Sequence, residues 1–259
     1  MASNKEPCSS EGKEYVAGLE KGLAIIEAFG IHNTPLTLSE AARITGHSRA
    51  AARRSLLTLQ ALGYVQLDGR HFRLAPRVLR LGHAYVSSTP LLKLVQPALE
   101  ALSERTRESS SVAVLDGSDV VFLARAATRR SLSAGLGLGS RLPAHGSATG
   151  RVLLAALPPE EAERRLKRMA RPQMTPNTRT GVDELMRMLA DVRVDGYAVS
   201  DEELELGVRS IAVPIQDASG QVVASMSIVA STRRRTLENV LGSLLPELES
   251  ARRMLGALL

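Results

Sequence analysis

Two short helices, each opened by a polar cap residue and closed by a glycine, follow one another near the start of the sequence. We predict them at Leu38–Thr45 and Ser48–Leu62, because a side-chain oxygen before a helix accepts from its first free N–H groups and glycine readily adopts the left-handed conformation that ends a helix. The residues that carry these signals are Thr37 with Glu40, Gly46, Ser48 and Gly63. Two helices joined by so short a turn indicate a helix-turn-helix unit.

An apolar helical pattern precedes this unit and a hairpin pattern follows it. The earlier pattern predicts a first helix over Leu19–Phe29, with apolar residues at positions 19, 23, 26 and 29. Val65–Leu67 and Phe72–Leu74 alternate on either side of an Asp-Gly pair, which is typical of tight hairpin turns. Three short helices and a hairpin predict a winged helix-turn-helix domain, which we assign to residues 15–76, behind a flexible polar tail of residues 1–14.

The remainder of the sequence predicts a linker followed by a larger α/β domain. A helix predicted over Pro76–Ser88 leads to a boundary at Thr89, so we assign residues 77–90 to a linker helix and residues 91–259 to the second domain. Short turns between predicted strands favour an antiparallel sheet with helices packed on it. The predicted strands are Ser111–Leu115, Val120–Ala124, Leu132–Leu138, Tyr197–Ser200, Ser210–Ile215 and Val222–Val229, and the predicted helices are Leu91–Arg107, Ser147–Leu157, Pro159–Ala170, Gly181–Arg193 and Leu237–Leu258.

Positive charge is concentrated in the N-terminal part of the chain. The 259 residues carry a net charge of +6, but residues 43–80 alone hold eight arginines against one acid, so the rest of the chain sums to −1. A local basic surface of this kind suits a polyanionic partner. Aromatic residues make up only 3% of the chain, which disfavours a protein that stacks single-stranded bases on aromatic side chains. We therefore expect the partner to be a double-stranded DNA operator.

The second helix of the pair presents the side chains that would read DNA. The DNA-binding residues that we predict are Arg49, Ala50, Arg53 and Arg54 in the helix, and Arg70 and Arg73 in the wing. Arginines in this place bind guanine edges or phosphates, and small alanines let the helix approach the groove closely. A merely solvated basic face is the alternative, and the absence of acids disfavours it. The predicted buried stripe of this helix is Ala52, Ser55, Leu56, Leu59 and Leu62.

The N-terminal tail and the cysteine content indicate the compartment. Cys8 is the only cysteine, so no intrachain disulfide can form, which fits a reducing cytoplasm. Residues 1–14 lack the apolar segment of a signal peptide. No apolar run approaches the ~18 residues of a membrane span. We expect a soluble, cytoplasmic protein with no membrane partner.

The second domain lacks most signatures of catalysis. Gly146–Gly150 holds its serine one position too early for a Gly-x-Ser-x-Gly nucleophile turn, and no cysteines and histidines have metal-ligand spacing. We therefore expect no catalytic residue, metal or cofactor, and we interpret Asp201, Glu202 and Glu203 as loop or surface charges. An effector-binding domain is favoured. An enzyme of α/β hydrolase or transferase type and a constitutive architectural DNA binder remain the alternatives.

A helix N-terminus offers this domain a place for an anion. We predict that a helix begins near Ser147. Its first turn would expose the N–H groups of Ala148, Thr149 and Gly150, where the helix dipole favours a carboxylate. Arg209 is the available cation nearest the set of pocket residues, but as a strand neighbour of Ser210 it is expected to point away from the pocket. Nearby hydroxyl groups belong to Ser200, Ser210 and Ser227, although each could instead bond to local backbone.

Several separated motifs, in order along residues 15–255, resemble the IclR family of transcriptional regulators. They are Leu19–Phe29, Leu62–Val65, Gly139–His145 and Gly196–Glu203. Ser48–Arg54, Glu108–Ser111 and Glu203–Pro214 are most similar to the β-ketoadipate-pathway group, the Pca and Pob type, whose members sense small aromatic or dicarboxylic acids.

This resemblance implies a winged-helix domain, a linker helix used in dimerisation and a C-terminal effector domain of GAF/profilin-like α/β type. It also implies a ligand-responsive regulator of catabolic genes that acts as a homodimer or homotetramer and responds to a small carboxylate effector. The positions that would line the effector pocket are Ala134, Leu142, Ala148, Thr149, Ser200, Ser210 and Ser227.

Overall fold

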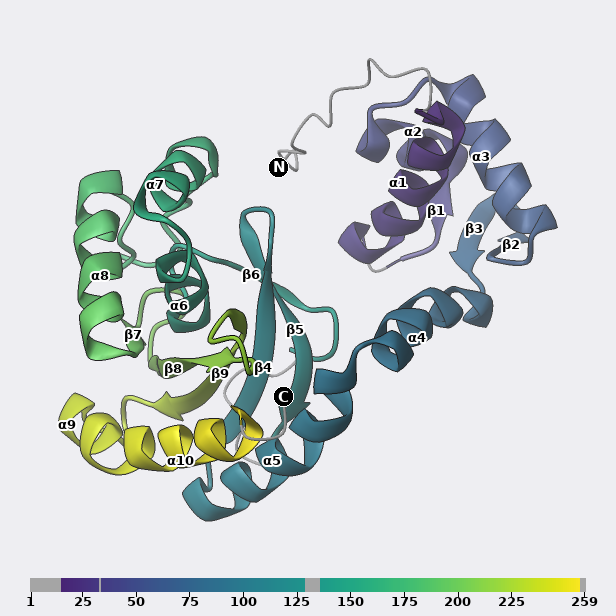
Figure 1. Ribbon diagram of the computed structural model, residues 1–259. Helices are drawn as coiled ribbons and strands as arrows, with labels where there is room; N and C mark the ends of the chain where they lie inside the picture. The colour runs from purple at the N-terminus through teal and green to yellow at the C-terminus, as the bar shows by residue number, and fades with distance from the viewer. Residues whose placement is uncertain (1–14, 33, 129–135, 257–259) are drawn as a thin grey trace. The chain divides into compact units, whose positions relative to one another are not determined.

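The computed structural model describes residues 15–32, 34–128 and 136–256, which divide into two compact units (Figure 1). Described residues up to Thr89 form the N-terminal unit, and those from Pro90 onward form the C-terminal unit. None of the helices in these ranges combines the length and the apolarity needed to cross a membrane.

The N-terminal unit packs helices on a small antiparallel sheet. Its elements are α1 (Ala17–His32), β1 (Leu36–Thr37), α2 (Leu38–Thr45), α3 (Arg49–Ala61), β2 (Val65–Asp68), β3 (His71–Leu74), the 3-10 turn η1 (Pro76–Val78) and α4 (Leu79–Ser88). The strand order is β1-β3-β2. Ile25, Ala52 and Leu56, from α1 and α3, are fully buried in its core. This arrangement confirms the predicted winged helix-turn-helix.

Both predicted helix starts are confirmed by their cap hydrogen bonds. The Thr37 hydroxyl accepts from the Glu40 N–H at 3.3 Å, and the Glu40 carboxylate accepts from the Thr37 N–H at 2.8 Å. Ser48 Oγ accepts from the Ala51 N–H at 3.2 Å. Each cap of this kind stabilises a helix by about 1 kcal/mol. Gly46 ends α2 with a φ of 69°, a conformation that glycine adopts without strain.

Half of the predicted apolar stripe of α1 is exposed, while Ile26 and Phe29 pack on the core as its other half. Leu19 and Leu23 are 63% and 45% exposed. The side chains that pack into the core are Ala24, Ile25, Ala28 and Phe29. Apolar residues occur on more than one face of this helix, so their spacing alone did not decide which face meets α3. Val16, Leu19 and Leu23, three and four positions apart, leave an apolar stripe exposed on the other face.

The C-terminal unit is built on one six-stranded antiparallel sheet of order β6-β5-β4-β9-β8-β7. This confirms the predicted α/β domain with an antiparallel sheet. The elements are α5 (Pro90–Thr106), β4 (Ser109–Asp116), β5 (Asp119–Ala126), β6 (Arg141–Pro143), α6 (Ala148–Ala155), α7 (Pro159–Arg168), α8 (Val182–Asp195), β7 (Ala198–Asp201), β8 (Val208–Gln216), β9 (Val222–Ser231), α9 (Leu237–Asn239), the π-helical turn η2 (Val240–Leu244) and α10 (Leu245–Gly256).

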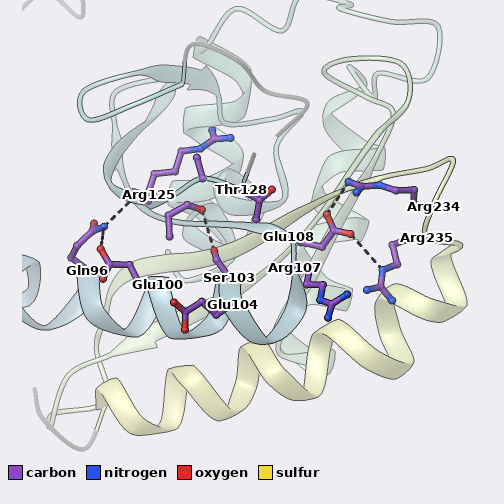
Figure 2. Close-up of a pocket in the computed structure, with 12 residues that line it drawn as sticks. Gln96, Glu100, Ser103, Glu104, Arg107, Glu108, Arg125, Thr128, Arg234 and Arg235 are labelled. Atoms are coloured by element: carbon purple, nitrogen blue, oxygen red, sulfur yellow. Dashed lines mark hydrogen bonds and ion pairs between the residues drawn. The ribbon is translucent and has the colours of Figure 1, made fainter. Parts of the chain in front are cut away.

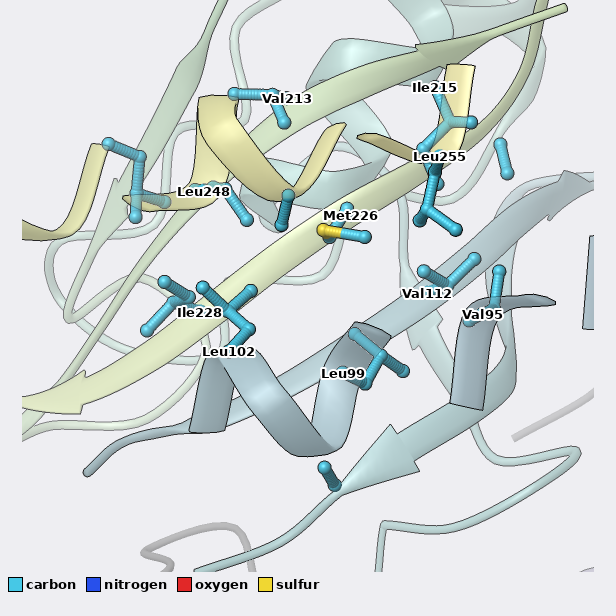
Figure 3. Close-up of a cluster of buried hydrophobic side chains, with 14 of the residues drawn as sticks. Val95, Leu99, Leu102, Val112, Val213, Ile215, Met226, Ile228, Leu248 and Leu255 are labelled. Atoms are coloured by element: carbon cyan, nitrogen blue, oxygen red, sulfur yellow. The ribbon is translucent and has the colours of Figure 1, made fainter. Parts of the chain in front are cut away.

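Helices cover both faces of this sheet (Figure 1). On one face, Leu99 and Leu102 of α5 and Leu248 of α10 bury against Met226 and Ile228 of β9 (Figure 3). The other face packs against α6, α7 and α8. The apolar stripe of α5 is therefore used inside its own unit, and the second face of the sheet is left to form a site with α6.

Two elements differ from their predictions. The strand predicted over Leu132–Leu138 falls mostly outside the described residues, and the strand observed at that edge is β6, which the sequence analysis did not predict. The final helix, predicted as continuous over Leu237–Leu258, is interrupted by the π-helical turn, and residues 257–259 lie outside the described part. Val240 and Leu244, at the two ends of that turn, are both buried.

Candidate DNA-binding surface and effector pocket

The N-terminal half of α3 presents the arginines predicted to read DNA. Arg49, Arg53 and Arg54 are exposed with Ala50 beside them, and their side chains pair with no described residue. The buried face of the helix consists of Ala51, Ala52, Leu56 and Leu59. Leu62 departs from the predicted stripe, because it lies at the helix end and is 51% exposed. Arginines without an acidic neighbour can bind an anion without first breaking an internal ion pair.

The wing supplies two further arginines in different surroundings. Arg70 is exposed at the hairpin turn. Arg73 on β3 forms an ion pair with Asp68 on β2, with a nitrogen–oxygen distance of 2.9 Å. The two side chains are 57% and 68% exposed, so water screens this pair and it competes weakly with a phosphate. Arg77 belongs to the same basic segment, but it donates to the Leu62 carbonyl and so caps the end of α3.

A cavity of about 290 Å³ in the C-terminal unit brings most of the predicted effector residues together. Its lining comes from the sheet face that packs against α6, from the start of α6, and from the 202–207 loop, which we define as the residues between β7 and β8. The predicted residues that line it are Leu142, Thr149, Ser200, Ser210 and Ser227.

Of the three other candidates, two lie elsewhere and one is outside the described residues. Ala148 is fully buried and packs with Val152 and Ala212 without lining the cavity. Ala134 lies outside the described residues. Arg209 points away as expected, since its Nε and Nη2 donate to the Asp201 carboxylate at 2.8 and 2.7 Å.

The hydroxyl groups at the cavity divide into two sets. Ser147 Oγ accepts from the Gly150 N–H at 2.9 Å, and Ser200 Oγ donates to the Gly146 carbonyl at 2.7 Å, so both stabilise the fold. The second set is open to a ligand. The hydroxyls of Thr149 and Ser210 line the cavity and bond to no other described residue. The paired oxygens of Ser111 and Ser227, 3.0 Å apart, retain one proton to donate.

The N-terminus of α6 is less open to an anion than the sequence suggested. The Gly150 N–H, one of the three predicted donors, is already taken by Ser147. Gly150 also lies so close to Ala144 that a Cβ would stand 2.2 Å from the Ala144 carbonyl oxygen, which explains the glycine. Of the three predicted donor residues, only Thr149 lines the cavity.

The cavity also holds a cation that the sequence analysis missed. Arg125 on β5 lines it beside Ser111, its partner on β4. Side chains alternate along a regular strand, so Arg125 would face away from Phe122, three positions earlier. The register shifts at Leu123, because Phe122 pairs with Ala113 while the next pair joins residues 124 and 112. This β-bulge turns Arg125 to the cavity side.

Burial lowers the pKa of the Arg125 guanidinium, because the charged form loses contact with water. An arginine nevertheless stays protonated at neutral pH. A partly desolvated cation beside apolar walls attracts a carboxylate more strongly than an exposed one does.

A buried ion pair joins two parts of the cavity wall. Arg151 on α6 and Glu203 in the 202–207 loop have side chains only 1% and 6% exposed, and Arg151 donates to both carboxylate oxygens, one at 2.6 Å. Arg151 also donates to the carbonyls of His145 and Val199 at 3.1 and 3.0 Å, and Glu203 accepts from the Arg179 N–H at 3.0 Å. Glu203 therefore lies in a loop, as one part of the interpretation had it, but it is buried and is not a surface charge.

A larger groove of about 1100 Å³ runs beside α5 (Figure 2). Its buried Glu108 is held by Arg234 and Arg235 at 3.2 and 3.5 Å. Arg125 is common to the two sites, and Figure 2 shows its side chain directed away from α5. None of the predicted effector residues in the described ranges lines this groove, and its buried carboxylate is already neutralised. The smaller cavity, with apolar walls and open hydroxyls, is the better ligand site despite its size.

Two known protein-family models match this chain, one over each unit. The description "IclR helix-turn-helix domain" matches residues 18–69, and "Bacterial transcriptional regulator IclR C-terminal" matches residues 83–256. The chain belongs to the IclR family. It is a transcriptional regulator whose N-terminal unit is a DNA-binding domain, and the predicted resemblance is confirmed.

Within this family, the chain is similar to regulators named for a Pca operon and for p-hydroxybenzoate hydroxylase. The Pca operon regulatory protein of Acinetobacter baylyi is 40% identical over 94% of this chain and 89% of its own length. The p-hydroxybenzoate hydroxylase transcriptional activator of the same organism is 39% identical over 94% of this chain and 93% of its own length. A crystal structure of an IclR homologue from Microbacterium hydrocarbonoxydans, complexed with 4-hydroxybenzoate, is 27% identical with a TM-score of 0.78, covering 93% of this chain and 98% of that one.

Proposed function

We propose that this IclR-type regulator binds its operator as a homodimer, or as a pair of dimers, and that a small aromatic carboxylate in the 290 Å³ cavity controls that binding. The observation that supports this proposal most strongly is a partly buried cation, Arg125, in the same cavity as the open hydroxyls of Thr149 and Ser210 and the paired hydroxyls of Ser111 and Ser227. Relatives named for the control of p-hydroxybenzoate hydroxylation and of a Pca operon support an aromatic acid, as does the 4-hydroxybenzoate bound by a homologue.

The effector carboxylate would be held by Arg125 and not by the N-terminus of α6. A guanidinium binds a carboxylate through two parallel hydrogen bonds, whereas a helix end adds only about 0.3–2 kcal/mol. Phe122, Leu136 and Leu142 supply apolar walls for a ring. Thr149 and Ser210 would then bond to the ring substituents.

Replacing Arg125 by Gln is expected to weaken binding of 4-hydroxybenzoate by about 10- to 100-fold, because a hydrogen bond to a charged group contributes about 1.5–3 kcal/mol. Thr149→Val and Ser210→Ala should each cost less, up to about tenfold. Calorimetry with the full chain measures all three. Arg168→Gln, at an exposed arginine of α7, is the matched control. Unchanged affinity in all three cavity variants would place the effector elsewhere.

We propose further that the cavity has no catalytic activity. Among the described residues that line it there is no histidine and no cysteine, so it lacks a Ser–His or Cys–His pair, and Glu205 is the lining carboxylate that an enzyme would have to use as its base. Incubation with aromatic acids and their esters should return them unchanged. Turnover that is lost in Ser210→Ala would instead support an enzyme.

The dimer is expected to form through α4. Leu79, Leu81 and Tyr85 are 72%, 46% and 47% exposed on this helix, while the apolar stripe of α5 is already buried. The exposed stripe of α1 is a second apolar surface on the same unit. Large apolar side chains exposed in this way mark an association surface.

Replacing Leu81 and Tyr85 together by Glu should therefore shift the protein towards monomer in sedimentation velocity. Affinity for a two-half-site operator should fall with it, because each half-site needs its own winged helix. Val194→Glu, at an 85% exposed valine of α8, is the control. An unchanged oligomer in the double variant would move the interface into the C-terminal unit.

A further inference from the structure

Leu204 occupies a particular place in the 202–207 loop, at the rim of the effector cavity. It lines the cavity and packs on Gly146, where a Cβ would stand 2.9 Å from Leu204 Cδ2. Such a distance is shorter than van der Waals contact allows, so only a glycine lets the leucine sit there without displacement. Leu206, two positions later, is 61% exposed and does not line the cavity.

The backbone on the N-terminal side of Leu204 is firmly tied. The Glu203 carboxylate is enclosed by Arg151, and the Thr178 hydroxyl donates to the Glu203 carbonyl. The Thr175 hydroxyl donates to the Glu202 carbonyl at 2.6 Å. The loop is therefore a fixed wall, because moving it would expose the buried carboxylate and break these bonds.

The far side of the loop is tied as well. Glu202 accepts from the Gly207 N–H at 2.7 Å and from the Thr232 hydroxyl at 3.3 Å, so its side chain closes the loop upon itself. The Thr232 N–H donates to the Gly207 carbonyl at 3.0 Å, which fastens the loop to the end of β9.

The sheet order places Leu204 across the cavity from the cation. Arg125 lies on β5 and the loop follows β7, with β4, β9 and β8 between them in the sheet. A ligand whose carboxylate rests on Arg125 therefore directs its opposite end towards the Leu204 side chain.

We propose that Leu204, held on Gly146 by the anchored loop, is the specificity-determining residue that limits effector length to a single ring. The inference rests on the proposed function, because it takes the cavity as the effector site. A rigid apolar wall excludes a longer acid by steric overlap, which costs more than the weaker packing of a shorter acid would. Shortening Leu204 should open space for a second ring beyond the first.

The test compares two acids that differ by one fused ring, 4-hydroxybenzoate and 6-hydroxy-2-naphthoate, by calorimetry on the full chain. The wild type is expected to bind the first and to bind the second much more weakly. Leu204→Ala should bind the naphthoate at least about tenfold more tightly than the wild type does. Leu206→Ala, a leucine of the same loop outside the cavity, should behave like the wild type.

If Leu204→Ala does not fold, the variant Gly146→Ala tests the same proposal. Its methyl group displaces only the flexible end of Leu204, so folding should survive and affinity for 4-hydroxybenzoate should fall. Unchanged affinity would overturn the proposal.

The wild-type measurements separate the two hypotheses. If the wild type binds both acids equally, Leu204 does not limit effector length, but the cavity can still be the effector site. The same conclusion follows if Leu204→Ala folds and gains no affinity for the naphthoate. A wild type that binds neither of these acids nor any other aromatic carboxylate overturns the proposed function, and the inference falls with it.

Discussion

Replacing Arg49, Arg53 and Arg54 together by alanine is expected to abolish sequence-specific DNA binding while leaving the protein folded. All three side chains are exposed at the N-terminal half of α3 and pair with no described residue, so the substitution breaks no internal ion pair. Each base-reading arginine contributes about 1–3 kcal/mol, and removing an arginine that binds phosphate lowers the salt dependence of binding by about one unit of slope. The triple variant should therefore bind at least about a hundredfold more weakly than the wild type.

Fluorescence anisotropy measures this effect with a duplex that the wild type has selected from a randomised pool. Arg164, Arg168 and Arg187 are exposed arginines of α7 and α8, and their triple alanine variant removes the same charge from the other unit. That control should bind almost as the wild type does. Near-normal affinity in a folded α3 variant would show that another surface reads DNA.

Local signals made the DNA-binding unit predictable from sequence. The caps at Thr37 and Ser48 and the glycine at Gly46 act within a few residues, and all three appear as predicted. The rotation of α1 was not predictable in the same way. Leu19 and Leu23 fit a helical apolar pattern as well as Ile25 does, and only the position of α3 decides which of them is buried.

Long-range pairing explains what the sequence could not show at the candidate effector cavity. The sequence analysis identified the lining serines Ser200, Ser210 and Ser227, because local patterns in the sequence mark the strands that carry them. Arg125 was missed because a one-residue bulge at Leu123 reverses the face of the strand, and no composition signal marks that bulge. Glu203 was misjudged because its partner Arg151 lies 52 residues earlier in the chain.

The buried pair of Arg151 and Glu203 should matter more for stability than any exposed pair in the protein. Replacing Arg151 by Met leaves the Glu203 carboxylate buried without its cation, which typically costs about 3–5 kcal/mol. For a domain of this size, each kcal/mol shifts the unfolding temperature by about 2–4 °C, so the C-terminal unit should melt about 10 °C lower. Calorimetric scans of the full chain measure this transition.

Two further variants test whether the loss of stability comes from the unpaired buried charge or from the loss of an arginine side chain in general. Arg105→Met breaks an ion pair with Glu247 whose side chains are 40% and 43% exposed, and it should change stability by less than about 1 kcal/mol. Arg151→Met combined with Glu203→Leu removes both buried charges and should recover part of the lost stability. Because Glu203 anchors the 202–207 loop, this double variant should remain weaker than the wild type in effector binding even where it regains its melting temperature. A single Arg151→Met variant as stable as the wild type would mean that Glu203 finds other partners and that the pair does not hold the cavity wall.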